Sequence, residues 1–409
     1  MKTITFYSYK GGVGRSLALV NIATRLVEFG KKVCVLDFDL EAPGLHLKFP
    51  LHEFGEDDKG IVDYLYEFSS KGIVEKSMEE YTYHINLGKR GESLQLIPAG
   101  NPDSSNYWRK LSSINWFEMI YENPNGLAFF LNLKESIKRD FNPDFLLIDS
   151  RTGISEMSGV SLSLLADEVV IVAANNKENL GGARRVIKSL FSNENNILNK
   201  VPNVHFVLSR IPFTNKPEDK AKEAQLLNKI LREYLTPYIN EINVIHSDRE
   251  LEEVEKIKIA YVNDDSNTQI SVDYLKLFEK ITKPYLTNEE ISKFNNIREA
   301  EQFISLAYID NPIHIKIDFV SKALELIPDN PDFYVFRASL YYNNEQWEEA
   351  YRDATKALTL FENHYDALLI QIYIHYKRNE YKQAAEKAIY LLNVNPDNYF
   401  GLLYIPVFL

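Results

Sequence analysis

The 409-residue sequence contains a single cysteine, Cys34, and no long apolar run. One cysteine excludes an internal disulfide and a metal site built from several thiolates, and it fits a reducing compartment. A membrane span needs roughly 20 apolar residues, and the first residues lack the apolar core and cleavage site of a signal peptide. We therefore expect a cytoplasmic protein that does not enter a membrane.

Positive charge is also scarce, because 46 Lys and Arg stand against 58 Asp and Glu, a formal net charge of −12. Nucleic acids and anionic lipids are bound mainly through clustered Lys and Arg. The balance argues against nucleic-acid and membrane partners. The eight histidines show no His-Glu-x-x-His spacing and no Gly-x-Ser-x-Gly motif occurs, so neither a zinc peptidase nor a serine hydrolase is indicated.

Short apolar segments alternate with amphipathic ones over the first 285 residues. We predict strands at residues 2–8, 32–38, 94–98, 145–149, 168–173, 204–209 and 242–245. Helical spacing of apolar residues predicts helices at 16–29, 127–140, 180–193 and 219–234. Buried strands separated by helices are typical of a doubly wound, mainly parallel α/β sheet. Residues 45–125 exceed a normal connection, and we interpret them as an insertion.

Beyond residue 298 the pattern becomes all-helical with a period of 34 residues. Trp347 and Tyr381 are one period apart, and Pro328 and Pro396 are two periods apart. This resembles the tetratricopeptide repeat, with units at 331–364 and 365–398 and a degenerate unit at 297–330. We expect a first domain at 1–285, a linker at 286–297, and a helical repeat domain at 298–409 that ends in a capping helix at 399–409.

A glycine-rich sequence, Lys10-Gly-Gly-Val-Gly-Arg-Ser16, joins the first predicted strand to the first predicted helix. Glycines allow the backbone to curl so that successive N–H groups point inward, and the helix start adds a positive dipole end. A hydroxyl at position 16 is placed as the Mg²⁺ ligand of a phosphate-binding loop. We predict that phosphates contact Gly11, Gly12, Val13, Gly14, Arg15, Ser16 and Leu17.

This loop resembles the deviant Walker A motif of the ParA/MinD family of ATPases, Lys-Gly-Gly-Val-Gly-Lys followed by Thr or Ser. The resemblance covers about residues 1–285. It implies ATP and Mg²⁺ as cofactors and a homodimer joined through the nucleotide face. Lys10 matches the family's signature lysine, which reaches the nucleotide of the partner subunit and is therefore assigned to catalysis.

Arg15 departs from the family pattern because it stands where the loop lysine contacts the β- and γ-phosphates. Arginine keeps the charge and can pair with phosphate through two N–H groups. Its planar guanidinium is larger than an ammonium, and phosphoryl transfer depends on alignment. We expect nucleotide binding with slow or conditional hydrolysis; a switch that only binds nucleotide is the other interpretation.

Acidic residues end two of the predicted strands. Asp37 and Asp39 are two positions apart and share a face of their strand, and Asp149 ends the strand at 145–149. By the resemblance, Asp39 positions or activates the attacking water, while Asp37 and Asp149 join Ser16 around Mg²⁺. Gly153 matches the switch II glycine whose N–H senses the γ-phosphate.

The base site and Arg151 are less defined by the sequence. Ser209 ends a strand where the family often has an asparagine that touches adenine, so ATP rather than GTP rests on the resemblance. Arg210 either stacks on the base or is exposed. Arg151 stands where the family commonly has proline, and a transition-state contact, a dimer contact and a plain surface position all stay open.

The leading hypothesis is an ATP-dependent switch that dimerises and docks a protein partner through its repeats. The architecture resembles variant ATPases of bacterial conflict or antiphage systems. A second hypothesis is an adaptor that binds nucleotide without hydrolysing it, which Arg15 favours, whereas retention of Asp37, Asp39 and Asp149 favours the enzyme. A DNA-partitioning ATPase is a third, weaker hypothesis, against which the net charge of −12 argues.

Overall fold

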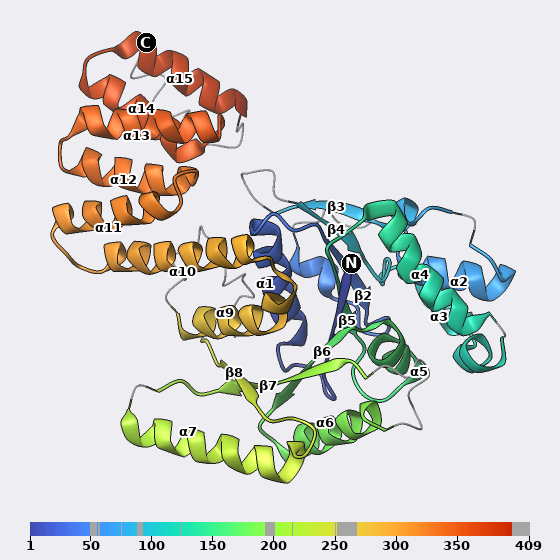
Figure 1. Ribbon diagram of the computed structural model, residues 1–409. Helices are drawn as coiled ribbons and strands as arrows, with labels where there is room; N and C mark the ends of the chain where they lie inside the picture. The colour runs from blue at the N-terminus through green and yellow to red at the C-terminus, as the bar shows by residue number, and fades with distance from the viewer. Residues whose placement is uncertain are drawn as a thin grey trace. The chain divides into compact units, whose positions relative to one another are not determined.

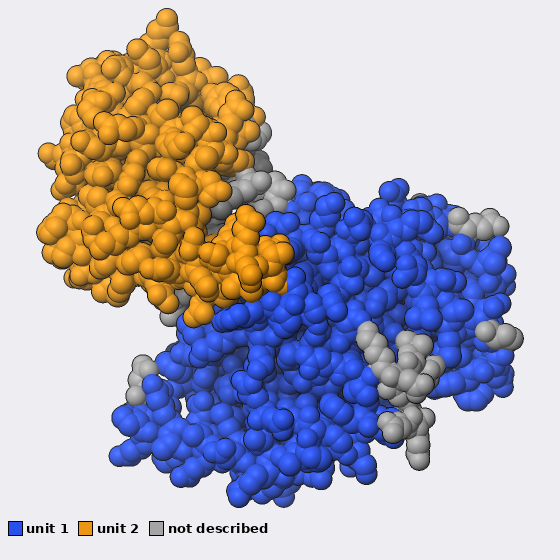
Figure 2. Space-filling model, viewed as in Figure 1, with its two compact units in different colours: residues 1–285 blue, residues 286–409 orange. Residues whose placement is uncertain are grey.

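The computed structural model describes residues 1–49, 55, 58–74, 76–87, 93–123, 125–192, 201–214, 216–249, 251 and 268–394. The chain forms two compact units, residues 1–285 and 286–409, which Figure 2 shows in different colours. Each unit has hydrophobic cores of its own. No helix in these described ranges is both long and apolar enough to cross a membrane.

The first unit is built on one eight-stranded sheet of order β3-β4-β2-β5-β1-β6-β7-β8 (Figure 1). Every neighbouring pair is parallel except β3 with β4. The strands are β1 Lys2–Tyr7, β2 Val33–Phe38, β3 Tyr83–Asn86, β4 Ser93–Ile97, β5 Phe145–Ser150, β6 Glu168–Ala174, β7 Asn203–Ile211 and β8 Ile242–His246. The predicted doubly wound α/β fold is therefore confirmed.

Helices cover both faces of this sheet. In β5 the side chains of Leu146 and Ile148 join the core formed with α2 (Ile61–Lys71) and α4 (Gly126–Phe141). Alternate residues of a strand point to the opposite face, where α1 (Arg15–Glu28) packs on β1, β2 and β5. The remaining helices of the sheet are α5 Glu156–Gly159, α6 Lys177–Leu190, α7 Pro217–Ile230 and α9 Gln269–Thr282.

The segment interpreted as an insertion contributes two strands to the sheet. It contains η1 Leu45–Lys48, α2, η2 Met78–Tyr81, β3, β4, α3 Ser105–Ser113 and the π-helical turn η3 Glu118–Glu122. A side chain at Gly60, just before α2, would collide with the backbone of Pro98 and Gly100. Glycine is required there because α2 starts directly against the end of β4.

The second unit consists of helices that pair as hairpins. They are α10 Asn288–Tyr308, α11 Ile313–Leu326, α12 Pro331–Asn343, α13 Trp347–Leu360, α14 Tyr365–Lys377 and α15 Tyr381–Val394, and α10 packs on α11, α12 on α13, and α14 on α15. The starts of α11, α13 and α15 are 34 residues apart, at Ile313, Trp347 and Tyr381. Small buried side chains, Ala350, Ala354 and Ala357, let neighbouring helices approach closely.

The linker expected at 286–297 is shorter in the structure. Thr287 caps α10 by accepting the amide N–H of Glu290, whose carboxylate accepts the N–H of Thr287. This reciprocal capping starts the helix at Asn288, so most of the expected linker is helical. Pro396 and the capping helix expected at 399–409 lie outside the described residues.

Candidate functional site

The glycine-rich loop leaves the sheet at its centre. β1 lies between β5 and β6, and the chain passes from Tyr7 through residues 8–14 into α1. Gly12 and Gly14 have φ angles of 73° and 84°, a left-handed backbone that favours glycine. Nothing lies within 4 Å of a Cβ built on Gly11, Gly12 or Gly14. The loop therefore presents open space above its own backbone.

The first turn of α1 faces this space with its amide groups uncapped. Gly14 supplies no side-chain cap to the 14-residue helix, and the first turn carries no acidic residue. The first N–H groups of a helix have no partner within the helix, and the dipole makes that end positive. A helix start of this kind, preceded by a glycine loop, is suited to bind an anion such as phosphate.

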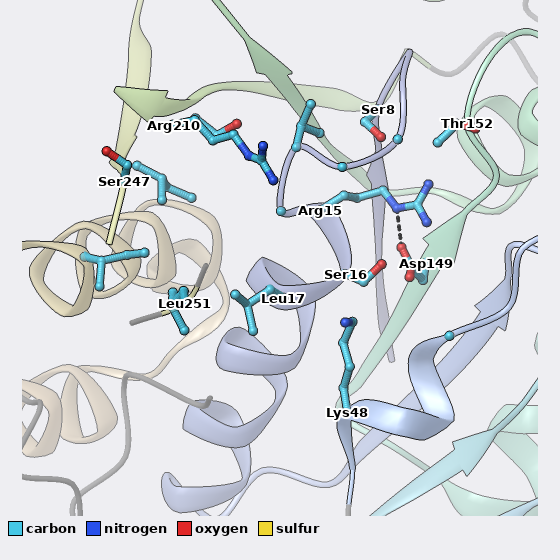
Figure 3. Close-up of a pocket in the computed structure, with 18 of the residues that line it drawn as sticks. Ser8, Arg15, Ser16, Leu17, Lys48, Asp149, Thr152, Arg210, Ser247 and Leu251 are labelled. Atoms are coloured by element: carbon cyan, nitrogen blue, oxygen red, sulfur yellow. Dashed lines mark ion pairs between the residues drawn. The ribbon is translucent and has the colours of Figure 1, made fainter. Parts of the chain in front are cut away.

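A cavity of about 770 Å³ opens over the loop. Its walls come from the loop and α1, from the segment after β2, from the ends of β5, β7 and β8, and from α9. Most of the predicted site residues line it (Figure 3): Gly11, Gly12, Val13, Gly14, Arg15, Ser16, Leu17, Asp39, Asp149, Ser209 and Arg210. The sequence motifs therefore meet in one cavity at the carboxyl edge of the sheet, as the topology of such sheets requires.

Arg15 does not point out toward the cavity mouth but turns to the carboxylates. Its Nη2 donates a hydrogen bond to Asp39 Oδ2 at 2.8 Å, and its Nε lies 2.5 Å from Asp149 Oδ1. The second contact is an ion pair without hydrogen-bond alignment. All three side chains are buried, Arg15 being 8% exposed. Figure 3 shows the guanidinium over Asp149.

Burial sets the charges of this cluster. Burial opposes the charged form of Arg15, but Asp149 and Asp39 outweigh it and raise the pKa of the guanidinium. Burial likewise raises the pKa of Asp149, against the lowering effect of Arg15. For Asp37, burial followed by the neighbouring Asp149 raises the pKa to about 8. Arg15 thus pairs with Asp39 and Asp149, while Asp37 is held in its neutral form below about pH 8.

Asp37 does not line the cavity. It is fully buried at the end of β2, where its carboxylate accepts the amide N–H of Asp39 at 3.2 Å and of Leu45 at 3.1 Å. These bonds shape the loop that carries Asp39. Asp37 is therefore placed beneath the metal position predicted for it, and a direct role as a ligand stays a prediction.

Lys10 and Gly153 also lie outside the cavity lining. Lys10 Nζ is 2.8 Å from Glu178 Oε1 in the first turn of α6. The carbonyl of Gly153 accepts a hydrogen bond from the Tyr7 hydroxyl at 2.9 Å, and Gly153 has a φ of 74°. The loop after β5 is thus tied to the end of β1, next to the glycine-rich loop.

The far end of the cavity is formed by residues that the sequence prediction partly missed. Ser209 is buried, and Arg210 has a φ of 58° at a bulge between β7 and β8. Residues 245–248 at the end of β8, Leu251, and Ile270 and Tyr274 of α9 complete this wall. The end of the strand predicted at 242–245 could have indicated residues 245–248, because parallel strands end at one edge. The two α9 residues have no sequence signal.

Two further basic residues lie on the side of the cavity where the loops after β2 and β5 meet. Lys48, in η1, lines the cavity and extends toward Ser16 in Figure 3. Arg151 Nη2 is 2.5 Å from Glu41 Oε2, which joins the loops after β5 and β2. No motif in the sequence selects Lys48, because its position depends on the turn of η1.

The residues present suit a hydrated divalent cation. The Ser16 hydroxyl lies beside Asp149 (Figure 3), whose buried Oδ1 pairs with Arg15 Nε at 2.5 Å. Oxygen donors of this kind are those Mg²⁺ prefers. Within the described ranges, no three His, Cys, Asp or Glu side chains converge to hold a metal ion alone. A cation here would need further oxygens from water or a bound phosphate.

A parallel sheet whose central strand enters a helix through a glycine loop, beside a strand that ends in a buried aspartate, defines the class of P-loop nucleoside triphosphatase folds. Residues 1–203 match the family model described as an AAA domain. This match lies wholly within the first unit, residues 1–285.

Curated and solved proteins are similar to the chain. The septum site-determining protein MinD of Helicobacter pylori is 25% identical over 246 residues, 59% of this chain and 78% of that protein. An iron–sulfur cluster carrier protein of Methanococcus maripaludis is 26% identical over 205 residues, 49% of this chain and 59% of that protein. The Aquifex aeolicus MinD structure shows 23% identity and a TM-score of 0.47, covering 70% of this chain and 99% of its own. The structure of MinD from Pyrococcus horikoshii, solved with Mg-ADP, shows 19% identity and a TM-score of 0.48. The match covers 69% of this chain and 96% of that chain.

Proposed function

We propose that the chain binds ATP with Mg²⁺ in the 770 Å³ cavity and acts as a nucleotide-dependent switch with slow or conditional hydrolysis. The observation that carries the proposal is the open, uncapped start of α1 beneath Gly11, Gly12 and Gly14. Amide groups in this arrangement hold phosphate oxygens without needing side chains. ATP rather than another triphosphate follows from the ParA/MinD resemblance.

The side chains around the loop divide the remaining work. Ser16 and Asp149 hold the Mg²⁺ ion, which neutralises charge on the phosphates when it is bound. Asp39, at the cavity wall, orients the attacking water and accepts its proton. Asp37 keeps the Asp39 loop in place through the amides of Asp39 and Leu45. Catalysis by such groups depends on position more than on acid strength.

The wall between β7, β8 and α9 is the proposed base site. Leu17, Ile245 and Ile270 give it apolar surface, and Ser209 and Arg210 give it polar groups. Apolar walls with a few placed polar groups are typical of small-ligand sites. Arg210 is exposed and lines the cavity, and in Figure 3 its side chain extends toward the glycine-rich loop, where a bound nucleotide would meet it.

A homodimer through the nucleotide face is the second part of the proposal. Leu47 after β2 and Ile154 after Gly153 are 79% and 71% exposed, although both are large apolar residues. Both follow loops that carry predicted switch residues. Exposed apolar side chains beside switch residues are suited to a contact that forms only in one state. Lys10 points away from its own cavity to Glu178, which leaves it on the surface that a partner would meet.

The repeats of the second unit are the proposed docking module for a protein partner. A role in bacterial antiphage defence is proposed from the resemblance of the whole architecture to variant ATPases of such systems. Paired helices at a regular spacing build extended surfaces that suit peptide or protein binding. The biological role is tested by expressing the gene in a phage-sensitive host. The wild-type gene should protect the host against infection, and the Asp149→Asn variant should not.

Calorimetry with ATP and ATPase assays on the wild type and Asp39→Ala test the biochemical proposal. We expect nucleotide binding in both proteins and hydrolysis in the wild type alone. The Arg15 ion pairs with Asp39 and Asp149 favour a second candidate, a nucleotide-binding adaptor without hydrolysis. ATP bound by both proteins with turnover in neither would select the adaptor, and absence of nucleotide binding would reject both functions.

A further inference from the structure

Arg15 bridges two strands of the sheet through their terminal carboxylates. Nη2 lies 2.8 Å from Asp39, which follows β2, and Nε lies 2.5 Å from Asp149 in β5. We propose that Arg15 is a built-in cation that excludes divalent metal from these carboxylates, and that nucleotide phosphates must draw it away before the metal enters. The inference rests on the proposed function, since it concerns the same metal and nucleotide.

The competition follows from the space around Asp149. Mg²⁺ binds oxygen at about 2.0–2.1 Å, and its retained waters extend further. A guanidinium nitrogen 2.5 Å from Asp149 Oδ1 occupies the same approach. A metal ion on this approach would be repelled by the guanidinium charge at short range, so each cation weakens binding of the other. The metal and Arg15 are therefore alternative partners of Asp149.

Arg15 has a second set of partners within reach of the same loop. Its Nη1 is buried and makes no hydrogen bond with any described residue, and the side chain lines the cavity above Gly11–Gly14. A phosphate would offer this guanidinium two parallel hydrogen bonds. Moving from carboxylates to phosphate keeps the arginine charge paired in both states, so the exchange leaves no buried charge alone.

The arrangement makes nucleotide and metal binding cooperative in a fixed direction. Without nucleotide the carboxylates are held by Arg15, and the metal binds weakly. With nucleotide, the phosphates take Arg15 and the freed carboxylates take the metal. Each ligand then raises the affinity of the other by the same factor. A lysine would provide one point charge and could not align with Asp39 and Asp149 through separate nitrogens.

Mn²⁺ titration of the nucleotide-free protein, followed by the paramagnetic resonance of free Mn²⁺, tests the competition. We expect Arg15→Gln to bind one Mn²⁺ at least about ten-fold more tightly than the wild type. Arg151→Gln is the matched control, because Arg151 pairs with Glu41 and touches neither Asp39 nor Asp149. In the double variant Arg15→Gln/Asp149→Asn the gained site should disappear.

Circular dichroism will show whether Arg15→Gln is folded. If it is not, Arg15→Lys takes its place, with a smaller gain expected because one ammonium cannot hold both carboxylates. Equal Mn²⁺ affinity in the wild type and a folded Arg15 variant would overturn the proposal. So would tight Mn²⁺ binding by the wild type that Asp149→Asn removes.

The titration contains no nucleotide, so it is independent of the proposed function. ADP binding in EDTA is measured separately by calorimetry. ATP binding in the presence of Mg²⁺ is measured in the same way. A gain of Mn²⁺ binding with no nucleotide binding in either buffer would reject the nucleotide function and keep the competition. Nucleotide binding with no gain of Mn²⁺ binding would keep the nucleotide function and reject the competition.

Discussion

Arg151 and Glu41 form a salt bridge that spans the two loops around the cavity, with 2.5 Å between Arg151 Nη2 and Glu41 Oε2. Glu41 follows the β2 strand and Asp39, and Arg151 follows β5 and Asp149. The pair thus lies outside the buried Arg15 cluster and joins the same two loops. This contact within the chain does not decide among the transition-state, dimer and surface roles left open for Arg151.

This pair should contribute little to stability. Both side chains are partly exposed, and exposed ion pairs contribute about 0–1 kcal/mol. We expect Arg151→Gln to change the free energy of unfolding in urea by no more than this. The exchanged pair Arg151→Glu/Glu41→Arg should recover whatever is lost. A loss above about 2 kcal/mol would show that the contact is more desolvated than the structure indicates.

Gly182 of α6 controls the position of the phosphate loop. A Cβ at Gly182 would overlap the ring of Tyr9, which precedes Lys10, whereas a Cβ at Gly181 meets nothing within 4 Å. We expect Gly182→Ala to displace Tyr9 and weaken nucleotide binding, measured by calorimetry. Gly181→Ala should leave affinity unchanged and add up to about 1 kcal/mol of helix stability.

A second substitution that removes the Tyr9 ring tests whether the overlap with this ring causes the loss of affinity in Gly182→Ala. Removing the ring in Gly182→Ala/Tyr9→Ala should restore part of the affinity lost in Gly182→Ala. If Gly181→Ala and Gly182→Ala weaken binding equally, α6 as a whole and not the Tyr9 contact would be responsible.

Lys48 should strengthen binding of the phosphates. It lines the cavity on the side of Ser16. A hydrogen bond to a charged group contributes about 1.5 kcal/mol at the lower limit of the usual range. We expect Lys48→Ala to weaken ATP binding by about ten-fold, since 1.4 kcal/mol corresponds to that factor. Lys59→Ala is the control, because Lys59 pairs with Glu80 outside the cavity. Equal affinities in the two variants would place Lys48 away from the phosphates.

Asp37 should make stability fall with rising pH in the nucleotide-free protein. Its pKa is raised from 3.8 to about 8 by burial and by Asp149, so the folded chain holds a proton that the unfolded chain has lost. The folded state therefore binds more protons between pH 4 and pH 8, and the free energy of unfolding decreases across that window. Above about pH 8 the decrease should level off.

Thermal melts of the wild type and Asp37→Asn from pH 6 to pH 9 measure this effect. The melting temperature of the wild type should fall more steeply than that of the variant, since asparagine does not titrate. Parallel curves would mean that Asp37 is ionised in the folded protein throughout the range.

The sequence predicted the parts of the fold that have a continuous signal. β2 and β5 are unbroken apolar runs that end in aspartates, and burial on both faces explains both features. β3, in contrast, was missed. Only Ile85 of its four residues is buried, so an edge strand this short carries neither a run nor a clear alternation.

The site was predicted where local sequence determines it and missed where tertiary contacts do. Residues 11–14 form a loop and residues 15–17 the first turn of α1, because the glycines allow the tight turn and the apolar spacing that follows starts the helix. Ile270 and Tyr274 reach the cavity only because α9 packs beside β8. The sequence supplied the charge of Arg15 but not its partners, since the guanidinium direction depends on two carboxylates that come from other strands.

β1 has parallel neighbours on both sides, β5 and β6, and stands near the middle of the eight strands. A strand held along both edges is among the last parts of a protein to open by local unfolding. The strand that leads into the glycine-rich loop is thus a fixed part of the structure. Any signal that the chain transmits on exchanging its ligand must come from the surrounding loops moving relative to this stationary centre, so hydrogen exchange should change around residues 39–47 and 150–154 while β1 keeps its protection.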